Sequence, residues 1–253
     1  FPSFNRQVYL QANRHHSLRH QYHQQEQNQV IDFGKFKQRQ HKVVLLPRSI
    51  SQEDYIALLD NTSKDIVFAT GPAGTGKTML GVLAAIRALK TGDIDKIVVT
   101  RPAVSVDEQH GFLPGTLVEK MAPWTRPIFD VFEEYYTPRE ITSMIEEGIV
   151  EVAPLAFMRG RTFKNAYILA DEMQNATPNQ MKMLLTRLGE NSEMVVTGDL
   201  AQADRLKDNG LLDFIGHLET RGTNKHLDVV RFEQGDIERH EAVKEVLSVY
   251  GDE

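Results

Sequence analysis

Short runs of consecutive apolar residues alternate along this chain with stretches in which apolar residues recur every three or four positions. The apolar runs are typical of strands buried on both faces, and they occupy residues 66–69, 96–100, 149–152, 166–170, 194–197 and 226–232. The helical spacing is clearest over residues 79–89 and stops at Gly92. Strands that alternate with helices predict an α/β fold with a doubly wound parallel sheet.

Capping patterns and apolar spacing indicate further helices. Residues 51–54 read Ser-Gln-Glu-Asp and resemble a capping box that opens a short helix before the first strand. Residues 177–180 read Thr-Pro-Asn-Gln, which places a cap, a proline at the first helical position and a glutamine at the third. A last helix is predicted for residues 237–250.

The alternation breaks between residues 102 and 163. Proline and glycine interrupt residues 111–127, aromatic side chains follow, and residues 137–140 cap a helix that ends at Gly148. We therefore expect one domain at residues 45–253 with an inserted helical segment at about residues 102–163. Residues 1–44 form a basic arm rich in glutamine and histidine, which we expect to be flexible.

Composition excludes several classes of protein. Of the 253 residues, 41% are hydrophobic and 25% are charged, as in ordinary soluble globular proteins. The absence of cysteine excludes disulfides, thiol catalysis and cysteine metal sites. No apolar run approaches the 18 residues of a membrane span, and the first residues lack the apolar core of a signal peptide. We expect a cytoplasmic protein that does not contact membranes.

Charge is distributed unevenly. Residues 1–42 contain seven Lys/Arg and two Asp/Glu, whereas the whole chain has a formal net charge of −6. A basic arm of this kind is compatible with a tether for nucleic acid. His16, His20 and His23 would share one face of a helix, but no acidic residue or cysteine accompanies them, so a solvated polar face is favoured over a metal site.

A complete phosphate-binding motif follows the first predicted strand and opens the helix after it. The motif fits G-x-x-x-x-G-K-[ST] at every fixed position and consists of Gly71, Pro72, Ala73, Gly74, Thr75, Gly76, Lys77 and Thr78. In such a P-loop, backbone N–H groups and the helix start face phosphate oxygens. Lys77 would reach the β- and γ-phosphates, and the Thr78 hydroxyl would ligate Mg²⁺. We expect Met79 to contact the nucleotide as well.

The predicted strand at residues 166–170 ends at Asp171 and Glu172. In P-loop proteins a second strand, beside the glycine loop, carries an aspartate that holds Mg²⁺, and we assign that role to Asp171. Glu172 would orient and deprotonate an attacking water. A third strand leads to Gln202 at the same edge of the sheet, where its amide would sense the γ-phosphate. Together these residues predict Mg²⁺-dependent hydrolysis of a nucleoside triphosphate.

Several segments occur in an order that resembles the PhoH family of P-loop ATPases, which are related to the first motor domain of superfamily 1 helicases. Besides the P-loop they are residues 101–102, 111–115, 156–162, 171–175, 180–182, 185–189 and 196–199. The resemblance covers about residues 45–252 and implies a RecA-like ATPase core, adenine contacts near Gln52, and a role in RNA or phosphate-stress biology. Some members carry a PIN-type ribonuclease domain, for which residues 1–44 are too short and too poor in acids.

Other classes of nucleotide-binding protein are weighed against this interpretation. A GTPase would need an N-K-x-D motif, but Asn224-Lys225 is followed by Leu227 in place of the aspartate. A P-loop kinase without a nucleic-acid role would use the insert as an acceptor site, and a nucleotide-dependent switch would bind ATP with negligible turnover. Glu172 favours hydrolysis because neither alternative requires a base there.

We also expect partners beyond the nucleotide. Arg101, Arg159, Arg161 and the arm would make weak contacts to single-stranded RNA or DNA. The chain has room for one motor domain and no evident arginine in cis on the P-loop side, so a neighbouring subunit is expected to supply one, in a ring that is expected to be a hexamer. Arg187 is the first candidate, and Arg205 and Arg239 follow.

Overall fold

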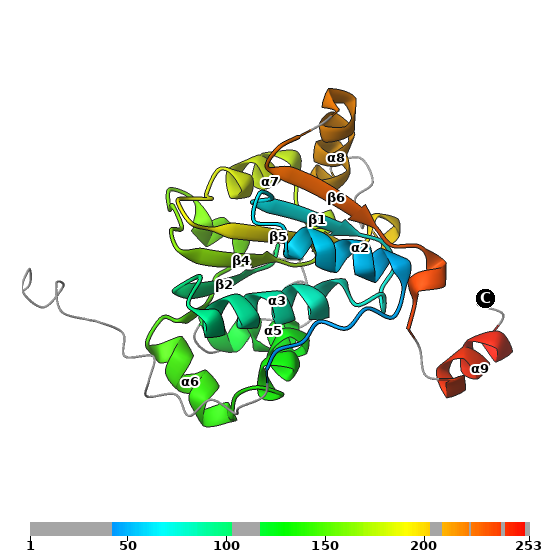
Figure 1. Cartoon of the computed structure of the whole chain (residues 1–253), viewed down its shortest axis with the longest axis horizontal. Coiled ribbons are helices and arrows are strands. Elements are labelled where there is room, and N and C mark those ends of the chain that lie inside the picture. Colours follow the sequence, from blue (N-terminus) through cyan, green and yellow to red (C-terminus); the bar gives the residue numbers. More distant parts are fainter. Residues whose placement is uncertain (1–41, 103–116, 203–208, 223, 239–240, 251–253) are drawn as a thin grey trace, which may run out of the picture. The chain divides into compact units, whose positions relative to one another are not determined.

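The fold is built on six parallel strands with helices on both faces (Figure 1). The computed structural model describes residues 42–102, 117–202, 209–222, 224–238 and 241–250, which lie within one compact unit of residues 39–253. The strand order is β3-β2-β4-β5-β1-β6. The strands are β1 (Ile66–Thr70), β2 (Lys96–Thr100), β3 (Val150–Val152), β4 (Ala166–Ala170), β5 (Glu193–Gly198) and β6 (Leu227–Arg231). The predicted doubly wound α/β fold is confirmed.

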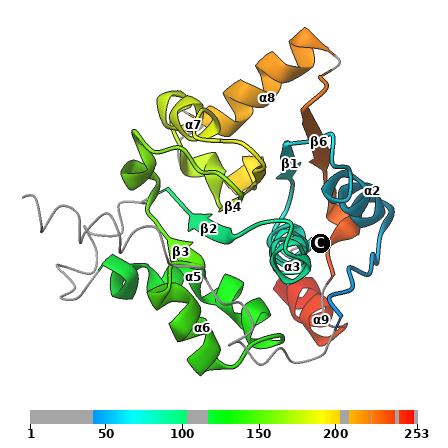
Figure 2. The same cartoon turned by 60° about the vertical axis from the view of Figure 1, so that its left-hand side comes forward.

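Helices cover both faces of this sheet because the central strands are apolar on both sides. The α-helices are α2 (Ile50–Leu59), α3 (Lys77–Thr91), α5 (Leu117–Glu133), α6 (Pro138–Glu146), α7 (Pro178–Leu185), α8 (Gly210–Arg221) and α9 (Glu241–Tyr250). Short 3₁₀ helices are η2 (Leu155–Met158), η3 (Met173–Asn175), η4 (Leu200–Gln202) and η6 (Gln234–Asp236). Helices α7 and α8 lie over one face and α3 and α5 over the other (Figure 2).

The core beneath α7 and α8 is continuous with the sheet. Met181 and Leu184 of α7 and Leu211 and Ile215 of α8 are buried in one cluster with strand residues that include Phe68. Burial of this apolar surface is the main force that holds the two helices on the sheet. The cluster fixes the segments that leave the carboxyl ends of β4 and β5, where the chemically important residues lie.

The order of the strands corrects one expectation about the site. The strand that carries Asp171, β4, is not the neighbour of the P-loop strand β1, because β5 pairs with both and lies between them. The register places Thr70 of β1 opposite Gly198 of β5. A residue of β5, Thr197, therefore lies next to Asp171, which the linear sequence does not reveal.

Two predicted helix starts need correction, and one is confirmed. The first helix begins at Ile50, because the cap is Ser49, whose side chain accepts from the Gln52 N–H, and not Ser51. The last helix begins at Glu241 and not at 237, because residues 234–236 form η6. Helix α7 has the predicted capping box of Thr177 and Gln180.

The predicted insert ends earlier than expected. Helices α5 and α6 do lie between β2 and β3, and α6 has the expected capping box of Thr137 and Glu140. However, β3 pairs with β2 as the edge strand of the main sheet, so the chain has rejoined the core by Val150 and not at residue 163. In the part of the chain that the structure describes, no helix is long and apolar enough to span a membrane.

Candidate functional site

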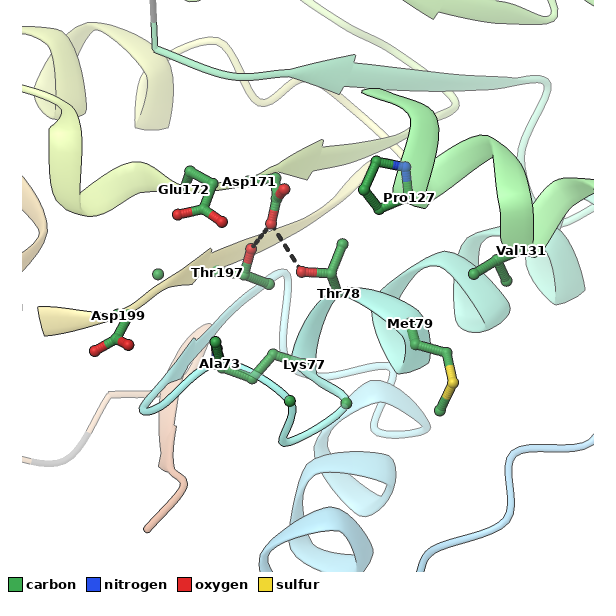
Figure 3. Close-up of a pocket in the computed structure, with 13 residues that line it drawn as sticks. Ala73, Lys77, Thr78, Met79, Pro127, Val131, Asp171, Glu172, Thr197 and Asp199 are labelled. Carbon is green, nitrogen blue, oxygen red and sulfur yellow. Dashed lines mark hydrogen bonds between the residues drawn. The ribbon is translucent and has the colours of Figure 1, made fainter. Parts of the chain in front are cut away.

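A cavity of about 300 Å³ opens at the carboxyl ends of β1, β4 and β5 (Figure 3). The P-loop forms one wall, the ends of β4 and β5 form another, and Pro127 and Val131 of α5 complete it. The lining residues are Ala73, Gly74, Gly76, Lys77, Thr78, Met79, Pro127, Val131, Asp171, Glu172, Thr197, Gly198 and Asp199. The structure thus brings most of the P-loop, and the following residue Met79, together with the two predicted carboxylates.

The backbone of the P-loop explains why its glycines are required. Gly71 has φ +139°, and a Cβ there would lie 2.3 Å from the Phe232 carbonyl oxygen, so no larger residue fits. Gly76 is the N-cap of α3 and supplies no side chain to cap it. The first N–H groups of an α-helix have no partner within the helix. At α3 they remain available to an anion at the cavity, with the favourable end of the helix dipole behind them.

The Lys77 side chain folds back onto the P-loop. Its Nζ donates to the carbonyl oxygens of Gly71 at 2.7 Å and Pro72 at 2.6 Å, and to Thr75 Oγ1 at 3.2 Å. Burial lowers the pKa of Lys77, and the charges of Asp199, Glu172 and Asp171 act in the opposite direction. The oxygen atoms that hold the Lys77 Nζ at the cavity wall are thus acceptors that phosphate oxygens can replace.

Two hydroxyl groups converge on Asp171. Thr78 Oγ1 and Thr197 Oγ1 donate to Asp171 Oδ1 at 2.8 Å and 2.5 Å (Figure 3). Thr78 and Asp171 therefore place a hydroxyl and a carboxylate oxygen side by side, which are the ligands that Mg²⁺ accepts while it keeps several waters. Among the described residues no group of three or more His, Cys, Asp and Glu could hold a metal, and the assignment of Thr78 and Asp171 as Mg²⁺ ligands stays a prediction.

Glu172 is held in a defined direction. Its backbone has φ +55° and ψ +38°, the left-handed region that a residue with a side chain rarely occupies. Gln174 Nε2 donates to Glu172 Oε2 at 2.5 Å, and Arg101 lies 3.3 Å from Oε1. Arg101 also donates to the Trp124 carbonyl of α5 at 2.9 Å. Arg101 thus lies beside Glu172 but does not line the cavity, and the expectation that a neighbouring subunit supplies an arginine to the γ-phosphate stays a prediction.

Neither Gln52 nor Gln202 is seen in the role that the sequence predicts for it. Gln52 is buried, its Oε1 accepts from the Arg48 N–H at 2.8 Å, and its Nε2 donates to the Thr75 carbonyl at 3.1 Å. Gln52 thus supports the P-loop from behind, and contact with adenine stays a prediction. Gln202 ends η4, but its side chain lies outside the described residues.

The predicted arginines are used in different ways. Arg161 forms a two-point ion pair with Glu151, and its guanidinium lies 4.5 Å from the centre of the Phe163 ring. Arg187 donates to the carbonyls of Met183 and Arg161, at 3.1 and 2.9 Å. It precedes β5 and so lies at the amino edge of the sheet, away from the cavity of its own subunit.

Of the remaining arginines and histidines predicted to have a role, one is exposed and the others lie outside the described residues. Arg159 is exposed. Arg205 and Arg239, the arm, and its histidines at 16, 20 and 23 lie outside the described residues.

Besides Pro127, Val131 and Gly198 of the cavity lining, three polar site residues escaped the sequence analysis. Thr197 lies inside the third strand, Asp199 follows it and lines the cavity, and Gln174 joins Glu172 to the Asp199 N–H. Asp199 directly follows β5, and Gln174 follows the Asp-Glu pair after β4 by two residues, so a polar residue near a strand end was an available signal for both. Thr197 had no such signal, because its role depends on β5 lying between β1 and β4.

A parallel sheet with a P-loop after β1, and with an Asp-Glu pair after β4 facing it across a cavity, defines a nucleotide-binding protein of the P-loop NTPase class. The chain belongs to the PhoH family, whose model, described as PhoH-like protein, matches residues 44–251. The family resemblance seen in the motifs is thereby confirmed.

Curated relatives cover most of the chain. A PhoH-like protein of Bacillus subtilis is 43% identical over 205 residues, which are 80% of this chain and 63% of the relative. A PhoH-like protein of Synechocystis is 38% identical and covers 89% of this chain and 68% of its own length. Protein PhoH of Escherichia coli is 42% identical, with 81% and 58% covered. The chain thus spans only part of each relative's length.

Solved structures are less similar. The Sulfolobus solfataricus SWI2/SNF2 ATPase core in complex with dsDNA aligns with a TM-score of 0.41 and 16% identity, over 78% of this chain and 47% of that one. A likeness of this size adds nothing to the fold assignment, which rests on the sheet topology and the P-loop.

Proposed function

We propose that the chain binds ATP with Mg²⁺ and hydrolyses it to ADP and phosphate. The observation that carries the proposal is the Glu172 carboxylate, which lies in the cavity one residue from Asp171 and is oriented by Gln174 and Arg101. Such a carboxylate is the group that hydrolysis needs and that nucleotide binding alone does not.

The described residues divide the chemical work. The P-loop N–H groups and Lys77 bind the β- and γ-phosphates, and Glu172 accepts a proton from a water as the water oxygen attacks the γ-phosphorus. The bond between the γ-phosphorus and the β,γ-bridging oxygen breaks, and ADP leaves with that oxygen. Mg²⁺, held by Thr78 and Asp171, would neutralise charge on the phosphate oxygens.

Turnover without any added acceptor tests this proposal. Lys77→Ala should abolish turnover and weaken ATP binding. Glu172→Gln should bind ATP nearly as the unaltered protein does and hydrolyse it at least ~10²-fold more slowly, the scale of a lost general base. Glu190→Gln is the control, since Glu190 has an 81% exposed side chain that pairs with Lys164.

The outcomes separate the alternatives. Wild-type kcat in Glu172→Gln would show that Glu172 is not the base. Tight ATP binding with negligible turnover in the unaltered protein would favour a nucleotide-dependent switch. Phosphate transfer that requires an added acceptor would favour a P-loop kinase.

We further propose that the protein binds single-stranded RNA or DNA weakly and without sequence preference. Arg159 is exposed directly after η2, and Phe157 within η2 is 62% exposed. Basic groups beside aromatic rings are what such binding uses, since rings stack on bases and cations contact phosphates. Arg101 and Arg161 are engaged with Glu172 and Glu151, so Phe157 and Arg159 are the leading contacts.

Fluorescence anisotropy with labelled oligo-U and oligo-dT checks this second proposal. Phe157→Ala and Arg159→Ala should each weaken binding, and affinity should fall steeply with salt as condensed ions are released. Arg87→Ala, which removes one positive charge that is paired with Asp60, is the control. Equal affinity at low and high salt, or no binding at all, would contradict the proposal.

A ring of identical subunits, with six as the expected number, is part of the same proposal, as are a cytoplasmic location and a role in RNA or phosphate-stress biology. A head-to-tail contact would let one subunit present an arginine to its neighbour's γ-phosphate. Arg187 remains the first candidate, although the carbonyls of Met183 and Arg161 hold its guanidinium within its own subunit.

A further inference from the structure

Gln174 connects two elements of the cavity wall. Its Nε2 donates to Glu172 Oε2 at 2.5 Å, and its Oε1 accepts from the Asp199 N–H at 3.2 Å. Glu172 follows β4 and Asp199 follows β5, so one amide joins the ends of two neighbouring strands. Both of these partners line the cavity, whereas Gln174 itself does not.

The surroundings leave Gln174 little freedom. Gln174 is 2% exposed and lies in η3, which packs against α8 and β5. A Cβ at Gly198 would lie 2.9 Å from Gln174 Oε1 and 2.5 Å from a Leu211 methyl group. The close approach of β5 at Gly198 thus holds the amide in place, and a side chain there would displace it.

The Glu172 side chain needs hydrogen bonds to keep one orientation. Its left-handed backbone conformation is unfavourable for a residue with a side chain, and about a third of the side chain (36%) is exposed. A partly exposed carboxylate on a short turn would sample several rotamers unless hydrogen bonds restrict it. The amide of Gln174 restricts it from the buried side.

We propose that Gln174 is a positioning residue for hydrolysis, which orients the Glu172 carboxylate toward the attacking water and links its direction to the segment after β5. The inference rests on the proposed role of Glu172 as the base. Loss of this hydrogen bond should lower kcat by ~10–10²-fold, since a displacement of about 1 Å at a reacting group has effects of that size. The KM and Kd for ATP should change little, because Gln174 does not line the cavity.

Two substitutions separate the contacts of Gln174. Gln174→Met keeps the approximate shape and removes both hydrogen bonds. Gln174→Glu keeps an acceptor for the Asp199 N–H, removes the donor to Glu172 and places a like charge beside it. Both variants should lose kcat with ATP binding retained, as measured with a fluorescent ATP analogue. Gln180→Met, which removes only the capping contact to the Thr177 N–H, should keep kcat.

A double-mutant cycle decides whether Gln174 acts through Glu172. In a Glu172→Gln chain, single-turnover hydrolysis should slow by less than ~3-fold when Gln174→Met is added, because the carboxylate that Gln174 positions is already gone. A loss that multiplies in full would show that Gln174 acts independently of Glu172. Wild-type kcat in Gln174→Glu would also overturn the inference.

The single substitutions keep this inference apart from the proposed function. If Glu172→Gln is slow and Gln174→Met is not, the base assignment stands and the positioning role fails. If Glu172→Gln keeps wild-type kcat, the base assignment itself fails.

Discussion

Replacement of Thr197 by valine would remove one of the two hydroxyl groups that hold Asp171. Thr197 is 4% exposed and donates to Asp171 Oδ1 at 2.5 Å, and valine has nearly the same shape. The same oxygen also accepts from Thr78 at 2.8 Å. Asp171 would therefore remain at the cavity with one contact fewer and a less defined direction.

The expected size of the effect follows from the charge of the acceptor. A hydrogen bond to a charged group contributes about 1.5–3 kcal/mol to stability. In a domain of this length 1 kcal/mol corresponds to roughly 2–4 °C, so Tm should fall by ~3–12 °C. Loss of a group that orients a metal ligand costs roughly 10–100-fold in metal affinity or activity. The Mg²⁺ concentration for half-maximal ATPase activity should rise by ~10–100-fold.

Thr100 provides a matched control on β2, the strand on the other side of β4. It is fully buried on β2, its carbonyl accepts from the Asp171 N–H at 3.0 Å, and its hydroxyl has no hydrogen-bond partner in the described part of the chain. Thr100→Val should thus leave Tm unchanged or raise it, because a buried hydroxyl without a partner is unfavourable.

The two valine variants are compared by thermal unfolding, followed by circular dichroism, and by ATPase rates measured over a range of Mg²⁺ concentrations. Equal Tm values and equal Mg²⁺ dependence in both variants would refute the argument that Thr197 orients Asp171.

Two other predictions concern a surface ion pair and the assembly. Arg161 lowers the pKa of Glu151 below its ordinary 4.5, chiefly through their hydrogen bond, so the pair stabilises the fold above that pH and the stabilisation is lost as pH falls through the lowered pKa. Glu151→Gln should therefore lower Tm at pH 7 and much less in acid; a difference in Tm that does not vary with pH would count against this. Mixing an inactive Arg187→Ala chain with an inactive Lys77→Ala chain should restore part of the activity, whereas a monomer that hydrolyses ATP at full rate would exclude the ring.

Local patterns were sufficient for most of the architecture. All six strands were predicted to within one or two residues, because buried parallel strands are continuous apolar runs with polar boundaries. The start of α2 was misplaced because Ser49 and Ser51 could each serve as its cap, and the start of α9 was misplaced because the short helix η6 precedes it. The extent of the insert was misjudged because the apolar run at residues 149–152 predicts a strand but not its partner, and only the pairing of β3 with β2 shows that this strand belongs to the main sheet.

The sequence by itself determined the class of protein, the phosphate loop and the two carboxylates after β4, because each depends on a few adjacent residues with a required backbone conformation. Only the tertiary structure decided which side chains surround them. Strand order placed Thr197 beside Asp171, packing of η3 placed Gln174 between Glu172 and Asp199, and the position of α5 gave Arg101 its contacts with Trp124 and Glu172. Arg101 is 23 positions from Trp124 and 71 positions from Glu172, and the contact of Gln174 with Glu172 depends on a turn of unusual conformation. Local sequence periodicity does not predict contacts between residues so far apart or across such a turn.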